Sequence, residues 1–326
     1  MTLQSAHRKK AERPRMGTIC LILLLLFSLA LLLRRADVAT NCMREGLSLC
    51  AYTVVPSLFP FMVLSELLVT SGAGEWIIAP IARPLGKFLG LSRAGCCAVI
   101  LGLVCGFPVG ARCSIVAYER GSISQDECER ALACSAIPSS AFLISTVGAT
   151  LWGDTKFGTQ LYIISILSAL LSGFLLHVGQ KHKQKREIKE TSAPPTKLRF
   201  EAEMFSNAVR NATMSTLLIC AYVVFFSTLT GAIGLILGRF GANETTHAIL
   251  SAVLELSGGV NAAAGLANRP LATLLTGIAV GWSGISVHCQ MLSLTDGHTL
   301  SVRPYFVAKL MQAILCVFLL WLILQK

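Results

Sequence analysis

The feature that most constrains this 326-residue chain is a series of apolar runs, each close to the length of a membrane-spanning helix. A helix needs about 20 residues to cross the roughly 30 Å of hydrocarbon in a bilayer. Only 14% of the residues are charged, whereas soluble domains have about 25%. We therefore predict an all-α polytopic membrane protein with about eight or nine hydrophobic segments, at residues 17–33, 47–71, 94–115, 128–150, 158–178, 210–237, 246–266, 271–294 and 305–324.

The net charge of +11 reflects where the basic residues lie. Five of the 28 precede the first apolar run, and seven more lie in or beside the polar loop 179–203. Lysine and arginine collect in cytoplasmic loops because they resist translocation. We therefore expect the N-terminus and this loop to be cytoplasmic, and we expect no binding of nucleic acid.

These features divide the chain into five parts. The first apolar run follows a basic stretch but precedes no small-x-small cleavage site, so we interpret it as an uncleaved anchor helix. The parts are a basic cytoplasmic arm, the anchor, a first repeat, a charged cytoplasmic linker and a second repeat, at residues 1–15, 16–35, 45–178, 179–204 and 205–326.

The charges also set a condition on the crossings. With the N-terminus and the linker on one side, an even number of crossings must separate them, yet five apolar runs lie between. One run must therefore fail to cross, or must enter and return. Run 94–115 is the best candidate, because three glycines and Pro108 interrupt it and both residue types weaken a helix. Unwound backbone at that depth is tolerated only where it is buried in protein or lines a wet cavity.

The second half repeats this arrangement. The stretch 254–264 can be laid without gaps on 101–111, so that Gly259 coincides with Gly106. We predict two inverted-topology repeats with broken or re-entrant helices, which is the plan of many secondary transporters. The alternative is four plain crossings in each half, with the basic loop outside.

Charged side chains in or beside these runs are candidate site residues. An intramembrane carboxylate usually faces the bundle interior or a water path, which singles out Glu66 and Glu255; the alternative for Glu66 is an interfacial position. Arg112 either snorkels to the interface or meets an anion or Glu255 inside. Pro108 and Asn261 are uncharged, but they lie in the two broken stretches and are further candidates.

A second set of candidates is polar and uncharged or weakly basic. Ser286, His288 and Gln290 are spaced by two, which aligns them on one side of an extended segment. The corresponding proline-broken stretch of the first half, 134–142, contributes Ser139. Hydroxyl, amide and imidazole groups suit a polar, uncharged solute such as a sugar or a nucleoside. The alternative is packing between helices, where such side chains commonly bond to one another.

The sequence favours no enzyme. It contains no CxxC, GxSxG, HExxH or P-loop pattern, so we predict no catalytic residues, no metal and no cofactor. Most of the 12 cysteines lie within or beside apolar runs, where a free cysteine behaves as a small hydrophobe. The partners considered are the lipid bilayer, a small polar solute such as a nucleoside, and a second copy of the chain.

Three motifs carry a resemblance to a known family. They read VPSLFPFMVLSELL at 55–68, GFPVGAR at 106–112 and GISVHCQ at 284–290. Together they resemble the sporulation integral membrane protein family called YlbJ, part of the wider nucleoside-recognition or Gate domain proteins. The resemblance implies Gate-like repeats at 45–178 and 205–326, a bacterial inner-membrane location, a nucleoside-transporter-like architecture and a role in spore formation.

The resemblance leaves the solute open. Family members tend to have Tyr-Pro-Met-Gly-Ala-Lys where this chain has Phe-Pro-Val-Gly-Ala-Arg at 107–112, and the stretch 135–142 lacks the asparagines usually found there. The leading hypothesis is a transporter-like or gated membrane protein for a small polar solute during sporulation. The alternative is a non-transporting membrane scaffold that supports spore assembly.

Overall fold

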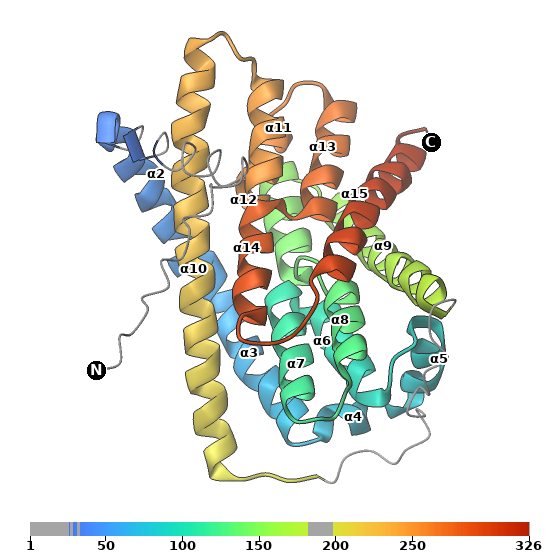
Figure 1. Ribbon diagram of the computed structural model, residues 1–326. Helices are drawn as coiled ribbons and strands as arrows, with labels where there is room; N and C mark the ends of the chain where they lie inside the picture. Colours follow the sequence, from blue (N-terminus) through green and yellow to red (C-terminus); the bar gives the residue numbers. More distant parts are fainter. Residues whose placement is uncertain (1–25, 27–28, 31–32, 182–197, 326) are drawn as a thin grey trace, which may run out of the picture.

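The computed structural model describes residues 33–181 and 198–325, together with Leu26, Leu29 and Ala30. The predicted arm 1–15 lies outside the described residues, as do most of the anchor 16–35 and the centre of the linker 179–204. All regular elements of the described part are helices (Figure 1), which confirms the all-α class.

The first half begins with α2 (Ala36–Leu49), a π-helical segment η1 (Cys50–Val54) and α3 (Val55–Thr70), which follow one another directly. Two short helices, α4 (Ala73–Ile77) and α5 (Ala79–Leu89), then turn the chain at the end of the bundle that we call the lower end (Figure 1). The rest of this half comprises α6 (Arg93–Cys105), α7 (Phe107–Glu119), α8 (Gln125–Cys134), the π-helical η2 (Phe142–Trp152) and α9 (Thr155–Lys181).

The second half has the same order of elements as the part of the first half that starts at α3, except that α4 and α5 have no counterpart. In each half a helix precedes two interrupted pairs, and another long helix follows them. The long helix that opens the second half ends at what we call the upper end of the bundle (Figure 1). The elements are α10 (Ala202–Arg239), α11 (Glu244–Leu254), α12 (Leu256–Ala264), α13 (Arg269–Trp282), α14 (Gly284–Thr295) and α15 (Arg303–Leu324).

Helices α6 and α7 form a hairpin. Gly106, at a φ of +100°, separates them. Residues eight apart on one helix are about 12 Å apart, whereas a Cβ atom on Gly110 would lie only 2.6 Å from the Cα of Gly102. The two helices therefore lie side by side, and run 94–115 enters the bundle and returns, from the lower end (Figure 1).

Helices α11 and α12 form a second hairpin, in the upper half of Figure 1. The chain is extended at Glu255, and a Cβ atom on Gly259 would lie 2.5 Å from the Cα of Ala252. The break falls four residues before Gly259, so the gap-free overlay on Gly106 is wrong by about one helical turn. The equivalent glycines are Gly110 and Gly259, each four residues after its break and each packed against the opposite arm.

The other two interruptions lie between α8 and η2, at residues 135–141, and between α13 and α14. In the latter, Ser283 and Gly284 have φ values of +71° and +78°, and the helix resumes at once. The expectation that Ser286, His288 and Gln290 lie on an extended segment is therefore wrong, because only Ser283 and Gly284 leave the right-handed helical region before the helix resumes.

Four helical stretches of the described residues are long and apolar enough to cross a membrane. A fifth results if α5 and α6, which meet at 95°, count as one span. Large apolar side chains such as Leu217, Phe225 and Ile314 point outward on α10 and α15, as expected for a lipid-facing surface. The four are Thr155–Gly179, Ala202–Arg239, Arg269–Thr295 and Arg303–Leu324. The polytopic membrane class is thus supported, whereas the predicted eight or nine segments and the inverted repeats stay predictions.

Small residues bring the inner helices close together. A Cβ atom on Gly281 of α13 would lie 2.5 Å from the Cα of Ala313 on α15, and one on Gly148 of η2 would lie 2.6 Å from the Cα of Gly158 on α9. Contacts between small residues let helix backbones approach within a membrane. The described cysteines are free, and most of them are buried in this interior.

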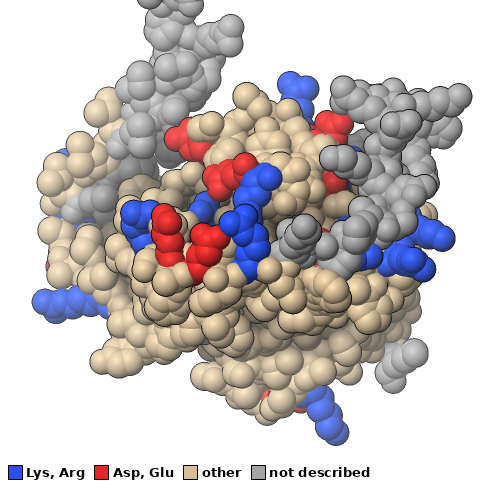
Figure 2. All heavy atoms as spheres, turned by 90° about the horizontal axis from the view of Figure 1, so that it is seen from below, with Lys and Arg blue, Asp and Glu red and all other residues tan. Residues whose placement is uncertain are grey.

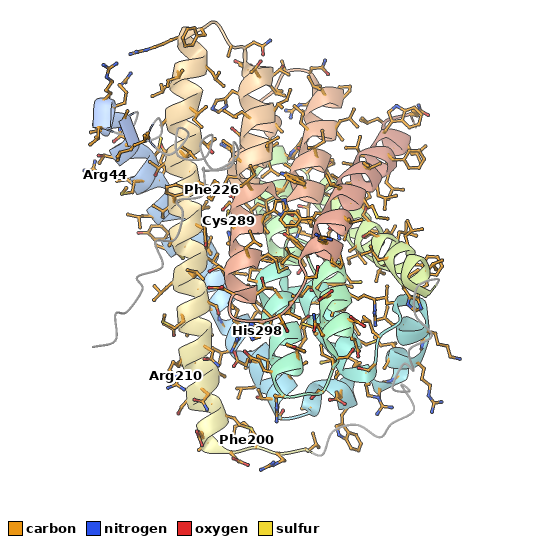
Figure 3. The ribbon with its side chains drawn as sticks, in the orientation of Figure 1. Arg44, Phe200, Arg210, Phe226, Cys289 and His298 are labelled. Carbon is orange, nitrogen blue, oxygen red and sulfur yellow. The ribbon has the colours of Figure 1, made fainter. Side chains whose placement is uncertain are left out.

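Charged side chains gather at the lower end. Seen from below, acidic and basic groups cluster on the face that carries the turn between α7 and α8 (Figure 2). His298, which lies low in the bundle (Figure 3), contacts Glu119 with Nε2 3.1 Å from Oε1. This end of the molecule is therefore polar, in contrast to its apolar sides.

Candidate functional site

The four interruptions meet around one cavity of about 410 Å³, which we call the central cavity. Each interruption contributes to its lining, through Gly106, Ser139, Glu255 and Ser283. Residues of η1 and α10, including Val54 and Val223, line another side. Unwound backbone is thus found where the bundle is hollow, which is the setting in which a membrane protein tolerates it.

The interruptions pack against one another in pairs. In the first half, a Cβ atom on Gly106 would lie 2.9 Å from the Cβ of Ser139, and the backbone N–H of Phe107 donates to the carbonyl oxygen of Ile137 at 2.6 Å. In the second half, a Cβ atom on Gly284 would lie 2.9 Å from the Cα of Glu255. In each half the tip of the hairpin therefore rests on the broken part of the next helix pair.

Polar groups in this cavity are held at the starts of helices. The buried carboxylate of Glu255 accepts hydrogen bonds from the backbone N–H groups of Ser257 and Gly258 at 3.0 and 2.5 Å. The hydroxyl of Ser139 likewise accepts from the N–H of Phe142 at 3.2 Å. Such caps satisfy N–H groups that have no partner within the helix, so the same side chains fix the breaks and line the cavity.

The walls combine polar edges with aromatic and aliphatic surface. Gln290 donates from Nε2 to the hydroxyl of Ser286 at 3.3 Å and also lines the cavity. Pro108, at the start of α7, lines it as well. The apolar part of the lining includes Tyr52, Phe107, Phe142, Leu256 and Val287. A cavity of this size with a few fixed polar groups is typical of sites for small organic ligands.

A second hollow of about 650 Å³, the upper cavity, adjoins the central one. It lies below the turn between α10 and α11 and is lined by Asn261 and by the carboxylates of Glu45 and Glu244. The two cavities share Leu49, Phe142, Thr146, Glu255 and Ser257. Glu255 therefore borders both cavities.

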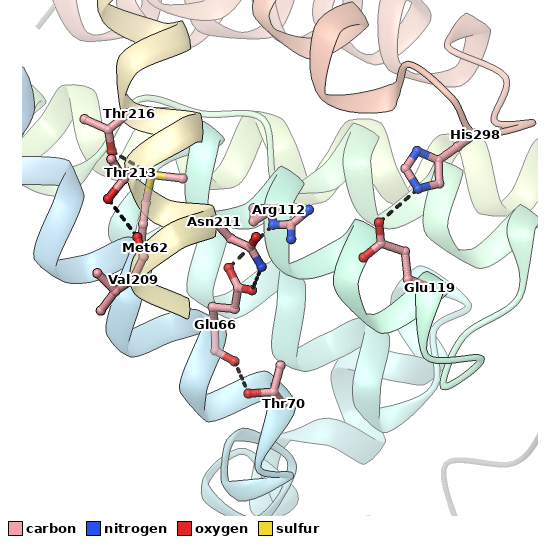
Figure 4. A network of polar contacts seen from close by, with 10 residues as sticks. All are labelled: Met62, Glu66, Thr70, Arg112, Glu119, Val209, Asn211, Thr213, Thr216 and His298. Carbon is pink, nitrogen blue, oxygen red and sulfur yellow. Dashed lines mark hydrogen bonds and ion pairs between the residues drawn. The ribbon is translucent and has the colours of Figure 1, made fainter. Parts of the chain in front are cut away.

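Glu66 and Arg112 form a separate cluster. The Nε atom of Arg112 on α7 lies 3.5 Å from Oε2 of Glu66 on α3, and Nδ2 of Asn211 on α10 donates to Oε1 of Glu66 at 2.6 Å (Figure 4). Arg112 therefore meets Glu66 and not Glu255, and the Glu66 side chain is buried among the helices. The cluster ties one arm of the first hairpin to two long helices.

Ser286, His288 and Gln290 do not lie on one side of the chain, as their spacing predicted. Because α14 is helical, Ser286 and Gln290 share one face, whereas His288 faces away from them. Nδ1 of His288 lies 2.8 Å from the hydroxyl of Tyr305, and its ring packs edge-on against Trp282 at 4.2 Å. Neither Ser286 nor His288 lines the two cavities. Of the nine candidates, the cavities thus gather Pro108, Ser139, Glu255, Asn261 and Gln290.

Sequence reasoning missed Lys309 and Ser283. Lys309, on α15, is fully buried and its Nζ atom donates to the hydroxyl of Ser283 at 2.8 Å. The available signal was a single lysine inside the last apolar run, 305–324. Within the described residues, no group of three or more histidine, cysteine, aspartate or glutamate side chains is arranged to hold a metal ion.

Interrupted helices around a cavity with a few fixed polar groups, inside a bundle with apolar sides, define an all-α integral membrane protein. The chain is similar to the sporulation integral membrane protein YlbJ of Bacillus subtilis (strain 168), with 23% identity over 343 aligned positions that cover 94% of this chain and 83% of that protein. This similarity confirms the resemblance to the YlbJ family that the motifs indicate. No family model matches the chain, and no solved structure matches it significantly.

Proposed function

We propose that this chain is a transporter-like protein of the nucleoside-recognition or Gate type, which binds a small polar solute in the central cavity and moves or gates it across the membrane. Its similarity to a sporulation integral membrane protein supports a role in spore formation. Location in a bacterial inner membrane, with the lower end cytoplasmic, belongs to the same proposal. The described residues that follow the basic linker lie at the lower end (Figure 1).

The observation that carries the proposal is the convergence of all four interruptions on one cavity. In secondary transporters, solute and ion sites lie where discontinuous helices meet near the middle of the membrane. Four helices, α7, η2, α12 and α14, start beside this cavity. Their N-terminal ends carry partial positive charge and therefore favour solutes that present oxygen atoms.

The lining favours a nucleoside-like solute. The rings of Phe107 and Phe142 offer surfaces on which a flat base can stack. The carboxylate of Glu255 accepts hydrogen bonds, and the amide of Gln290 can both donate and accept them, which suits the hydroxyl groups of a sugar. A volume of about 410 Å³ is sufficient for a molecule of this size.

Two further features support the inverted repeats within this proposal. Apart from α4 and α5, the two halves have the same order of elements, and their hairpins occupy opposite halves of the bundle in Figure 1. Each hairpin tip also rests on the following interruption, through Gly106 in one half and Gly284 in the other. Two such halves with opposite orientation supply one gate on each side of a shared site.

The test is uptake and binding of a panel of labelled nucleosides by the full chain in liposomes. We expect uptake by the wild type and a loss for Gln290→Leu, which removes a polar group from the cavity. The matched control is Gln160→Leu, because Gln160 is exposed on α9 and lines neither cavity; this variant should keep wild-type uptake.

The outcomes separate a transporter from a scaffold. Absence of both uptake and binding across the panel, by folded wild-type protein, would overturn the proposal and favour the scaffold. Equal losses for Gln290→Leu and Gln160→Leu would show that the central cavity is not the site. Binding without uptake would assign the cavity a recognition role and would contradict transport.

A further inference from the structure

Lys309 places its amino group in the interior of the bundle. Its side chain is completely buried, and its Nζ atom donates to the carbonyl oxygen of Ala136 at 2.8 Å, to the hydroxyl of Ser283 at 2.8 Å and to Oε1 of Gln312 at 3.0 Å. Ala136 belongs to the interruption after α8, and Ser283 to the interruption after α13. The lysine therefore joins the unwound segments of the two halves.

The surrounding hydrogen bonds show that these three oxygen atoms act as acceptors. The hydroxyl of Ser283 donates to the carbonyl oxygen of Val280 at 3.1 Å, which leaves its lone pairs for Lys309. The Nε2 atom of Gln312 donates to the carbonyl oxygen of Ala133 at 3.1 Å, which directs Oε1 toward Lys309. Three acceptors match the three N–H groups of an ammonium ion, whereas a neutral amine has only two.

The charge has no acidic partner. Among the described residues, no carboxylate lies within ion-pair distance of Lys309. Instead, α8 and α13 both end at the segments that contact it. The C-terminus of a helix carries roughly half a negative charge, so two such ends together offset about one positive charge. This is an environment for a small cation, built from a carbonyl, a hydroxyl and an amide oxygen.

We propose that Lys309 is a tethered cation: its ammonium group fills a site for a small monovalent cation formed by Ala136, Ser283 and Gln312. The ammonium holds the two interruptions together, so this core needs no free sodium or potassium ion at that position. The inference deepens the proposed function, because it concerns the ion requirement of a transporter-like core. Its test measures stability and not flux, so it can fail or succeed independently of solute transport.

The experiment is thermal unfolding of the purified full chain in detergent, in sodium, potassium or ammonium chloride and in choline chloride at equal ionic strength. The wild type should melt at the same temperature in all four salts. Lys309→Ala opens the site and should melt several degrees lower in choline. Its melting temperature should rise with the concentration of at least one small cation, because a ligand that binds only the folded state stabilises it.

The control variant is Lys309→Met, which fills much of the same volume with an apolar chain and leaves little room for an ion. It should be destabilised in all four salts, without recovery in any. A cation effect of equal size in Lys309→Ala, Lys309→Met and the wild type would reflect ionic strength or detergent and would overturn the proposal. The same melting temperature for Lys309→Ala in all four salts would also overturn it.

A second variant covers the outcome in which Lys309→Ala does not fold in choline. Lys309→Ser adds a hydroxyl oxygen as a further ligand, and both variants should then fold in the presence of the small cation. Failure of both to fold in sodium, potassium and ammonium salts would contradict a cation site, because each leaves the site open to the ion. If the wild type takes up no nucleoside but the melting temperatures are as expected, the proposed function fails and this inference stands.

Discussion

Gly284 lies directly against the backbone of Glu255, so that a Cβ atom on Gly284 would be 2.9 Å from both the Cα and the nitrogen of Glu255. This contact joins the tip of the second hairpin, α11–α12, to the interruption between α13 and α14. Backbone that meets backbone cannot move aside as a flexible side chain can. The closeness of the two segments therefore depends on the absence of a side chain at position 284.

We expect Gly284→Ala to destabilise the protein for two reasons. Its φ of +78° costs a non-glycine residue roughly 1–2 kcal/mol, and the crowding against Glu255 adds about 1–3 kcal/mol. The control is Gly297→Ala, because Gly297 has the same φ of +78° but no atom within 4 Å of an added Cβ. Thermal unfolding should show a larger loss at 284; equal losses would mean that the contact contributes nothing.

A second prediction concerns the close approach within the first hairpin. Gly110→Ala places a methyl group 2.6 Å from the Cα of Gly102, so α6 and α7 must separate, at a cost of about 1–3 kcal/mol. Gly238→Ala is the control, because Gly238 also lies in a helix but meets no atom within 4 Å. There alanine should stabilise the helix by up to about 1 kcal/mol. Unfolding shifts of opposite sign are expected, and a stabilised Gly110→Ala would contradict the hairpin.

The first hairpin could be predicted because its signal is local. Three glycines and Pro108 interrupt one apolar run, which weakens a helix there whatever the rest of the chain does. The second break was misplaced because Glu255, and not a glycine, makes it. Its carboxylate caps the helix that follows, through the N–H groups of Ser257 and Gly258, and a match of glycine to glycine does not reveal such a cap.

The partners of the candidate residues could not be predicted, because they come from distant parts of the chain. Arg112 meets Glu66, which is 46 positions away, and Lys309 meets the carbonyl oxygen of Ala136, which is 173 positions away. A backbone carbonyl carries no residue-specific signal at all. His288 was grouped with Gln290 because residues two apart point to the same side of an extended segment. In a helix, which is what forms here, they do not.

The pair of Glu66 and Arg112 should contribute measurably to stability. The Glu66 side chain is only 5% exposed and that of Arg112 20%, so solvent screens their attraction less than at the surface. A double-mutant cycle with Glu66→Gln and Arg112→Gln should give a coupling energy of roughly 1–3 kcal/mol. Chemical unfolding of the four proteins in mixed micelles measures it.

The control for this cycle is the exposed pair Arg199 and Glu201, whose side chains are 68% and 52% exposed. Exposed ion pairs contribute little, so Arg199→Gln and Glu201→Gln should couple by less than about 0.5 kcal/mol. Equal coupling energies in both cycles would show that the cluster of Glu66, Arg112 and Asn211 is not a specific link between α3, α7 and α10.

The last prediction separates a site role of His288 from a packing role. His288 bonds to Tyr305 and packs on Trp282 and Phe306 but lines neither cavity. We therefore expect His288→Ala to lower the free energy of unfolding by about 1–3 kcal/mol, while the folded fraction binds nucleosides as the wild type does. Tyr305→Phe, which removes one hydrogen bond and keeps the ring, should cost about 1 kcal/mol. A His288→Ala variant that melts normally but loses binding would place His288 on the solute path.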